Sequence, residues 1–341
     1  WEITFEEIHR NAAIAQALRK YLNFSDDNEF MINKGIKILI AISRFWKQRV
    51  NYSNALNKYV ILGVTGPNEY ENNVDNNWYT NYSAKWCLEY TTQILKKIAD
   101  TNLDHYKKIL NETSLEKTEI SNWNKIVENI YLPYCKDLDV FIQNDGFLNK
   151  DLRPVSSIPI DQRPINQNWS WDKILRSPYI KQADVLQGFY FFEDDFSKDE
   201  LLNNFNYYEQ FTVHESSLSA CIHSILASKA NDLNKAYDYF IRASRLDLDD
   251  YNKEIKQGLH ITSMGGTWMS IVEGFAGLKI INDKVYLNTK IPKQWESYFF
   301  KVNLKNRKIE IKVNHELTSV RLISGDKINI VINDTDTYLK N

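Results

Sequence analysis

The sequence predicts a mainly α-helical protein that ends in a small antiparallel β domain. Apolar residues recur at helical spacing as far as about residue 278, and beyond Leu278 short runs alternate apolar and polar residues between turn signals. Long irregular stretches connect the helices, and helix pairs joined by such loops favour a ring of α-hairpins with a site at one mouth. We therefore expect a helical domain over residues 1–278 and a β domain over residues 279–341.

The helical pattern begins at the start of the chain. In the segment Trp1–Asn23, apolar side chains such as Ile8, Ala12 and Leu18 fall on one helix face. Further helices are expected at Asn33–Val50, Tyr79–Asp100, Leu115–Val127, Tyr179–Phe192, Ser216–Lys229, Leu233–Leu246 and Gly266–Gly277. Thr113 or Ser114 is expected to cap the helix that starts at Leu115. Because the chain opens with Trp1 inside a helical pattern, we expect it to be part of a longer protein.

The β domain follows from period-two alternation. Strands are expected at Lys279–Tyr286, Ser297–Leu304, Lys308–Val313, Thr318–Ser324 and Lys327–Ile332, with turn signals at Asn282-Asp283, Asn306-Arg307, Asn314-His315 and Gly325-Asp326. The expected role of this domain is to brace the helical domain.

Composition excludes several functions. The chain has 341 residues, with 42 Lys+Arg against 44 Asp+Glu and a net charge of −2, which argues against a nucleic-acid binder. No apolar run approaches the roughly 20 residues that span a bilayer, so no membrane partner is expected. Cys87, Cys135 and Cys221 lack metal-site spacing and predict buried thiols of a reducing, cytoplasmic compartment. We expect neither a metal nor a cofactor.

One loop carries candidate acids. The stretch Gly63-Val-Thr-Gly-Pro-Asn-Glu-Tyr-Glu-Asn-Asn73 presents Glu69 and Glu71 beside Tyr70. A glutamic acid in a partly enclosed site can have a raised pKa and act as a general acid. The alternative is a polar loop that leads into the next helix.

Three further segments offer donors for a sugar or an anion. Lys181 and Gln182 stand before an apolar helix and suit sugar hydroxyls, unless they only supply first-turn polarity. Thr212-x-x-Glu215 fits a capping box, so the stretch with Ser216 and Ser217 either starts a helix or exposes amides and hydroxyls to an anion.

The last of these segments is Gly258-Leu-His-Ile-Thr-Ser-Met-Gly-Gly-Thr-Trp268. The side chains of His260, Thr262 and Ser263 and the amides of Gly265 and Gly266 resemble an anion cradle, although the Gly-Lys-Ser/Thr ending of a phosphate-binding loop is missing. Together the four segments suggest a sugar-and-phosphate site, but the sequence does not prove that they meet in space.

These segments also carry a family resemblance. Residues 1–11, 63–73, 181–184, 214–219 and 260–266 are similar to signature segments of glycoside hydrolase family 65 disaccharide phosphorylases. The similarity spans nearly the whole chain, and several ordered motifs are more specific than any one alone. The resemblance implies an (α/α)₆ catalytic barrel, incomplete at its N-terminus here, followed by a small β domain.

The resemblance also implies an activity of the glycosyltransferase type. Members cleave α-glucosidic disaccharides with inorganic phosphate and invert the anomeric centre, and the match over residues 63–81 favours maltose as the substrate, giving β-glucose 1-phosphate and glucose. Kojibiose, nigerose and trehalose stay open as substrates, as does a hydrolase on the same scaffold, similar to acid trehalases. A homodimer is implied. Whether the fragment is active by itself stays open.

Roles for individual residues follow from the same resemblance. Glu69 would be the general acid. Lys181 and Gln182 would hold the donor glucose. The phosphate would be bound by His260, Thr262, Ser263 and Gly265, with help from Ser216 and Ser217. A phosphorylase needs no carboxylate base, because phosphate is itself an anionic nucleophile, whereas an inverting hydrolase needs an acid and a base.

Overall fold

The structure is a computed structural model that describes residues 3–281 and 284–340. The chain forms two compact units. The first unit comprises residues 3–22 and 26–151, and the second comprises residues 23–25, 152–281 and 284–340. The boundary that the sequence predicts at residue 278 lies within the second unit and stays a prediction.

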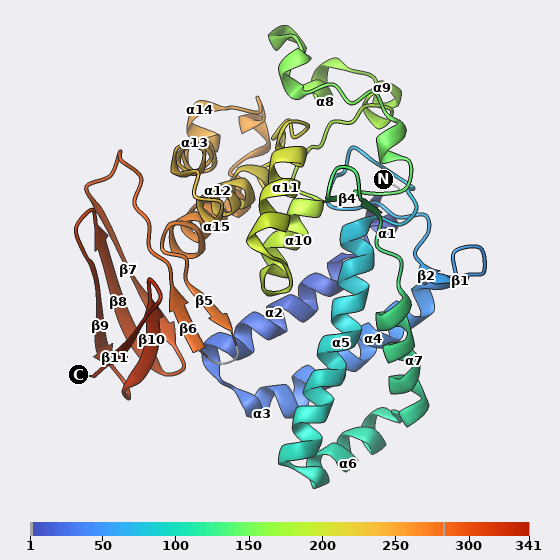
Figure 1. Cartoon of the computed structure of the whole chain (residues 1–341), viewed down its shortest axis with the longest axis vertical. Coiled ribbons are helices and arrows are strands. Elements are labelled where there is room, and N and C mark those ends of the chain that lie inside the picture. The colour runs from blue at the N-terminus through green and yellow to red at the C-terminus, as the bar shows by residue number, and fades with distance from the viewer. Residues whose placement is uncertain (1–2, 282–283, 341) are drawn as a thin grey trace. The chain divides into compact units, whose positions relative to one another are not determined.

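The first unit is helical, with short β ribbons. Its elements are α1 (Ile3–Glu6), α2 (Arg10–Ser25, whose last residues belong to the second unit), α3 (Asn28–Phe30), a π-helical turn (Met31–Gly35), α4 (Ile36–Arg49), α5 (Trp78–Thr101), α6 (Leu103–Thr113) and α7 (Lys117–Asn129). The long helix α5 packs against α4 and α7 (Figure 1). Trp46, Trp78 and Trp123 are fully buried and form much of this core. Their burial explains why these amphipathic segments are helical in this protein.

Two predictions for this unit are wrong. Helix α6 was not expected, because its sequence is mostly polar; it begins where the Asn102 side chain accepts a hydrogen bond from the amide of His105 at 3.0 Å. Ser114 does not cap the next helix. It ends α6 in a left-handed conformation (φ 49°), and Glu116 instead caps α7 in a reciprocal capping box with Glu119.

Two short β ribbons of this unit were not expected from the sequence. Strands β1 (Asn51–Ser53) and β2 (Lys58–Val60) pair antiparallel, as do β3 (Tyr134–Cys135) and β4 (Val140–Phe141). An isolated bridge joins Tyr59 to Ile130. These pairings anchor the loops that run from the ribbons toward residues 63–77 and 142–151.

The second unit begins with short turns and helices and then forms a helical layer. Its helices are α8 (Ile165–Asn168), α9 (Trp171–Leu175), α10 (Val185–Phe191), α11 (Lys198–Glu209), α12 (Ser219–Lys229), α13 (Leu233–Ser244), α14 (Leu246–Asp249) and α15 (Ile261–Met269), which continues as a π-helical turn (Ser270–Phe275). Helix α12 is buried from Ser219 to Ser228 and packs against α10, α13 and α15 (Figure 1). A helix buried on all sides shows little amphipathic periodicity, and α12 is the centre of this layer.

Four expectations for this layer are corrected. Helix α11 was not expected. Helix α10 begins at Val185 rather than at Tyr179, because Ile180 pairs with Thr212 in a parallel bridge. The predicted capping box at Thr212 is absent, since α12 begins only at Ser219, after Leu218. Helix α15 begins at Ile261, five residues before the predicted start at Gly266.

The β domain contains two sheets. One has the strand order β11 (Thr335–Leu339), β10 (Ile328–Ile332), β6 (Lys284–Leu287) and β5 (Lys279–Ile281), and the other has the order β7 (Ser297–Leu304), β8 (Arg307–Asn314) and β9 (Thr318–Ser324). All pairs are antiparallel except β6 with β10, which is parallel at Ile330 and Val285, so the all-antiparallel prediction is wrong there. Strand β11 was also not expected. The predicted turn at Asn282-Asp283 lies outside the described residues.

A search of the described helices for a membrane-spanning segment found none of sufficient length and apolar character.

Candidate active site

Glu69 lies on a closed loop of the first unit. The backbones of Val64 and Val74 exchange two hydrogen bonds, of 2.9 and 2.8 Å, so the residues between them form a compact loop with adjacent ends. Gly63 stands at the entrance with φ +64°, and its amide donates to the Asp75 carboxylate at 3.0 Å. Glu69 is partly exposed, whereas the neighbouring Tyr70 is buried. The loop therefore presents one accessible carboxyl group on a rigid base.

Residues near the start of the chain hold this loop in place. One oxygen of the buried Glu6 carboxylate accepts hydrogen bonds from the Thr65 hydroxyl at 2.7 Å and from the Asn73 amide at 2.9 Å. His9 lies near the backbone of Thr65 and edge-on to Tyr79, with the ring centroids of His9 and Tyr79 5.6 Å apart. Burial lowers the pKa of His9 to about 4, so the ring is neutral at pH 7. We call Glu6 and His9 the loop clamp.

The second carboxylate of the loop has a different environment. Glu71 is buried and forms an ion pair with Lys150, whose side chain is also largely buried. This pairing ties the loop to the end of the first unit. Of the two carboxylates of this loop, Glu71 is thus held in a buried ion pair, whereas Glu69 is partly exposed.

In the second unit, backbone pairing brings two predicted segments together. The amide of Val213 donates to the carbonyl of Ile180 at 2.9 Å, and the amide of Glu215 donates to the carbonyl of Lys181 at 3.1 Å. Lys181 is partly exposed and Gln182 is buried. The donors proposed for the sugar therefore lie beside the segment 213–217, which was proposed for the anion.

A buried histidine organises the turn before α12. His214 has φ 56°; its Nδ1 lies 2.8 Å from the Ser219 hydroxyl and its Nε2 lies 3.1 Å from the Tyr239 hydroxyl. Arg242 donates to the His214 carbonyl at 2.8 Å. Burial lowers the pKa of His214 well below its usual value, so the ring serves as a neutral hydrogen-bonding hub. Glu215, which the predicted capping box had used, accepts instead from the amides of Ile165 and Asn166.

Three residues behind this turn have ligand atoms within 4.8 Å of one another, close enough to hold a metal ion: Glu209, His214 and His223. The sequence analysis predicted no metal. In the structure, His223 is buried and its Nδ1 lies 2.9 Å from the Glu209 carboxylate, which Tyr239 also contacts. Despite the opposing effect of burial, the hydrogen bond and charge of His223 lower the pKa of Glu209 to about 2. This carboxylate therefore contacts both His223 and Tyr239.

The two hydroxyl-bearing segments meet directly. The hydroxyls of Ser217 and Thr262 lie 3.0 Å apart at a solvent-exposed position, although 45 residues separate them in the chain. The Ser216 hydroxyl accepts from the amide of Leu218 at 3.2 Å. The Ser263 hydroxyl is buried and donates to the carbonyl of Ala243 at 2.8 Å, which fixes the start of α15 against α13.

His260 is held by an aspartate that the sequence analysis did not single out. Its Nδ1 lies 2.5 Å from Asp247 Oδ1, and its amide donates to Asp247 Oδ2 at 2.9 Å. These bonds hold the pKa of Asp247 below its usual value. They also fix Nδ1 as the donor to the carboxylate, so Nε2, which lies 4.0 Å from the Glu254 carboxylate, is the ring atom that could contact a ligand.

The glycines that follow have different surroundings. Both lie inside α15, where amides bond to the carbonyl four residues earlier, so the expected amide cradle at Gly265 and Gly266 is not formed. An added Cβ on Gly265 would meet no atom within 4 Å. On Gly266 it would come within 2.6 Å of the Cys221 side chain, so Gly266 permits the close packing of α15 on α12.

The second unit therefore brings Lys181 beside Glu215, and Ser217 beside Thr262, with His260 one residue before α15. Glu69 belongs to the first unit. Sequence reasoning missed the residues that orient the candidates, namely Glu6, His214 and Asp247. Asp247 is acidic and precedes His260 by 13 residues, so a contact between the two side chains was possible from the sequence. That separation is too long for the local patterns that were used to find candidate residues.

Comparison with known proteins identifies the family. Residues 1–269 match the glycosyl hydrolase family 65 central catalytic domain, and residues 278–338 match the C-terminal domain of the same family. The chain belongs to glycosyl hydrolase family 65. The predicted fold class is thereby confirmed: a mainly helical region of the (α/α)₆-barrel catalytic domain precedes a small β domain.

Individual relatives carry related names. The chain is 46% identical over 340 residues to a maltose phosphorylase of Bacillus subtilis (strain 168), covering 100% of this chain and 44% of that protein. It is 40% identical over 335 residues to an alpha,alpha-trehalose phosphorylase of Thermoanaerobacter brockii, covering 98% and 43%. A solved structure named "Putative kojibiose phosphorylase from human microbiome" matches with a TM-score of 0.88 and 36% identity, covering 96% of this chain and 43% of that one. The chain thus spans less than half the length of the relatives that it matches.

Proposed function

We propose that the protein containing this chain is an inverting disaccharide phosphorylase that transfers a glucosyl group from an α-glucoside to inorganic phosphate. The observation that carries the proposal is the meeting of Ser217 with Thr262, two residues after the oriented His260, since hydroxyl groups can donate hydrogen bonds to an oxyanion. Family membership supports the same chemistry.

Each candidate has a role in this reaction. Glu69 donates its proton to the glycosidic oxygen as that bond breaks, while a phosphate oxygen attacks the anomeric carbon from the opposite face. Lys181 and Gln182 hold the donor glucose. His260 Nε2 and the hydroxyls of Thr262, Ser216 and Ser217 hold phosphate.

The remaining phosphate-binding candidates act less directly in this proposal. Gly265 leaves room for the ion, because it has no Cβ. Ser263 keeps its predicted place beside the phosphate, and its bond to Ala243 aligns the helix start. No cofactor is needed, because phosphate is a substrate.

The geometry favours phosphorolysis over hydrolysis. A hydrolase on this scaffold needs a free carboxylate to activate water. Asp247 is engaged by His260 and Glu215 by two backbone amides, and the Glu254 carboxylate lies 4.0 Å from His260 Nε2, within ion-pair range of the ring. Donors then remain for an anion, and phosphate replaces activated water as the nucleophile.

Maltose is the substrate that we propose, with β-D-glucose 1-phosphate and D-glucose as products. The support is the higher identity to a maltose phosphorylase than to the trehalose and kojibiose phosphorylases. Kojibiose, nigerose and trehalose are the competing substrates. We also propose a homodimer in the cytoplasm. The three cysteines are free thiols, but Cys135 is half-buried, so the prediction that all three are buried is wrong for that residue.

The test is disaccharide cleavage by the full-length protein that contains this chain. Maltose, kojibiose, nigerose and trehalose are each incubated with and without inorganic phosphate, and β-glucose 1-phosphate is scored by an anomer-specific assay. The proposal predicts phosphate-dependent cleavage with maltose as the fastest substrate. Cleavage without phosphate that releases two glucose molecules would contradict it, and faster turnover of another disaccharide would replace only the substrate assignment.

A further inference from the structure

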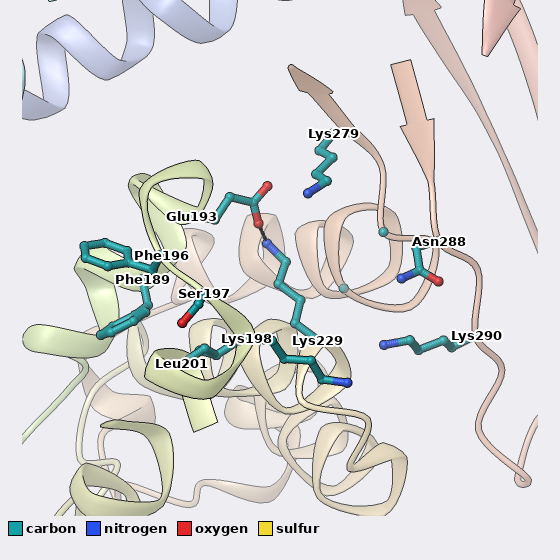
Figure 2. A pocket seen from close by; sticks show the side chains of 12 residues that line it. Phe189, Glu193, Phe196, Ser197, Lys198, Leu201, Lys229, Lys279, Asn288 and Lys290 are labelled. Carbon is teal, nitrogen blue, oxygen red and sulfur yellow. Dashed lines mark hydrogen bonds and ion pairs between the residues drawn. The ribbon is translucent and has the colours of Figure 1, made fainter. Parts of the chain in front are cut away.

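A lysine-rich pocket of the second unit is not explained by disaccharide cleavage. It has a volume of about 240 Å³ and is lined by residues from α10 to α12 and from the segment that leads into the β domain. Lys198, Lys229, Lys279 and Lys290 line it, against a single carboxylate, Glu193. None of the residues proposed for disaccharide or phosphate binding is part of its lining. We call it the lysine pocket (Figure 2).

The charges in this pocket are not balanced. Glu193 forms an ion pair with Lys229. Among the described residues no ion pair is formed by Lys198, Lys279 or Lys290, so the lining has a surplus of three positive charges, four lysines minus one glutamate. Figure 2 shows the side chains of Lys198 and Lys290 pointing toward one another from α11 and from the segment after β6. Like charges that face each other across a cavity repel unless an anion lies between them.

The lowered pKa of Lys290 is consistent with this repulsion. Lys290 is partly buried, its ammonium group donates to the carbonyl of Ser228, and its charge faces that of Lys198. Burial, together with the charge of Lys198, lowers the pKa of Lys290 to about 8. These surroundings therefore make the charged form of Lys290 less stable than it is in water, and a bound anion would reverse this effect.

The other walls define the rest of the ligand. Phe189, Phe196 and Leu201 give an apolar side, and Asn288 offers an amide for hydroxyl groups. The volume corresponds to roughly eight water molecules at about 30 Å³ each, more than a single inorganic ion requires. It is below the roughly 300–1,000 Å³ of sites for drug-sized ligands, so the occupant is small.

We propose that the lysine pocket binds a small sugar phosphate, with the phosphate group between Lys198, Lys279 and Lys290 and the sugar against Phe189 and Phe196. Three lysines from different elements can surround the tetrahedral phosphate dianion of a ligand. A ligand with a single carboxylate group would leave two of these lysines without an anionic partner. The pocket is an anion site apart from the proposed catalytic phosphate site, and the inference does not depend on turnover.

The test is isothermal titration calorimetry on the full-length protein, with glucose 6-phosphate as the probe. Lys198→Ala and Lys279→Ala are each expected to weaken binding about tenfold, as the loss of one charge-assisted contact does. Both variants leave the buried bond from Lys290 to Ser228 intact, so the fold is kept. Lys312→Ala, which removes an exposed lysine on β8 of the β domain, is the matched control and should leave the dissociation constant unchanged.

Further arms separate this pocket from the catalytic site and from simple ion binding. The variant His260→Ala should bind the probe as the parent does, inorganic phosphate should bind at least tenfold more weakly than glucose 6-phosphate, and β-glucose 1-phosphate tests whether the reaction product also binds here. At pH 8 the probe is fully dianionic and should raise the pKa of Lys290, so titrations in buffers of different ionisation enthalpy should show proton uptake.

Three results would overturn the proposal. They are no detectable binding at millimolar probe, equal binding by the parent and the Lys198→Ala and Lys279→Ala variants, and loss of binding in His260→Ala, which would assign the probe to the catalytic site. A failure of disaccharide cleavage would not affect any of these measurements, so the two proposals fail independently.

Discussion

Two glutamates of one loop have different environments, and this difference agrees with the roles proposed for them, Glu69 as the general acid and Glu71 as a support of the loop. Glu69 is accessible, whereas Glu71 is buried against Lys150. A carboxyl group that donates a proton in a reaction must reach its substrate, and a buried ion pair cannot do so. The two residues therefore form a matched pair for mutagenesis.

Replacing Glu69 by Gln removes the proton donor while keeping the shape of the side chain. We expect kcat to fall about 10²–10⁴-fold, the usual worth of a general acid, with little change in disaccharide binding or in Tm. Steady-state kinetics on the full-length protein measure this. Near-normal turnover of the variant would show that Glu69 is not the acid.

The matched change, Glu71→Gln, should act on stability instead. It leaves the largely buried Lys150 without its carboxylate, and breaking a buried pair in this way costs on the order of 3 kcal/mol. A lower denaturation midpoint with mostly retained kcat in the folded fraction is expected. An intact midpoint would mean that Lys150 finds another partner or reaches water.

At the proposed phosphate site, changes to His260 and to Asp247 should affect the kinetics of one substrate, phosphate. We expect His260→Ala to raise the KM for phosphate by at least tenfold, with a much smaller change for the disaccharide. Asp247→Asn should give a weaker effect of the same kind, because it only orients the ring. Initial-rate measurements with each substrate varied in turn provide the comparison, and equal effects on both substrates would count against this pocket.

At the scale of elements, the packing of α15 on α12 depends on one glycine. A Cβ on Gly266 would come within 2.6 Å of the Cys221 side chain, whereas a Cβ on the adjacent Gly265 would meet nothing within 4 Å. Gly266→Ala should therefore lower stability by about 1–3 kcal/mol through overpacking. Gly265→Ala should be neutral or raise stability by up to about 1 kcal/mol through helix propensity, while raising the KM for phosphate if the ion lies beside it. Thermal melts of both variants measure the change in stability, and initial rates at varied phosphate concentration measure the KM. Equal melting temperatures of the two variants would contradict the packing role of Gly266.

Elements with strong local patterns were the ones that the sequence predicted best. The long helix predicted at Tyr79–Asp100 is observed at Trp78–Thr101, and the strands Ser297–Leu304 and Thr318–Ser324 are observed with those bounds. In these elements the pattern of apolar and polar residues repeats with the period of the helix or strand, so the sequence pattern predicts the type of element and its bounds.

Capping signals show where local reasoning stops. Ser197-x-x-Glu200 and Thr212-x-x-Glu215 look alike in sequence, yet only the first forms a capping box and starts a helix. Glu215 is used by amides some 50 residues earlier in the chain, at Ile165 and Asn166. The same limit applies to the candidate site: each segment was recognisable, but the contact between Ser217 and Thr262 depends on how α12 and α15 pack.

At the scale of the whole molecule, buried titratable groups make stability depend on pH. The folded protein keeps His9 neutral with a pKa of about 4, against 6.5 in the unfolded chain, and holds the pKa of Glu209 at about 2, against 4.5. In both cases the unfolded state binds a proton that the folded state does not, so stability falls as the pH falls. The histidine acts between about pH 6.5 and 4, and the glutamate between about 4.5 and 2.

The expected result is a loss of stability on acidification from pH 7 to pH 5, of which His9 contributes on the order of 1–2 kcal/mol. Urea denaturation at the two pH values measures it, and the variant His9→Gln should lose less between them. An exposed histidine, changed as His105→Gln, is the control and should show the parent's loss. The role assigned to His9 would be refuted by an equal loss in His9→Gln and the parent.

The loop clamp has a consequence for the choice of the N-terminal boundary in truncated versions of the protein. An expression clone whose first codon lies beyond Glu6 would leave the Thr65 hydroxyl and the Asn73 amide without their acceptor, although both are far downstream. Such a shortened product would lose part of the signature segment 1–11 but would retain Glu69 and the signature segments from residue 63 onward. Its acidic loop would nonetheless be released from its anchor, so an inactive truncated clone would say nothing against the chemistry.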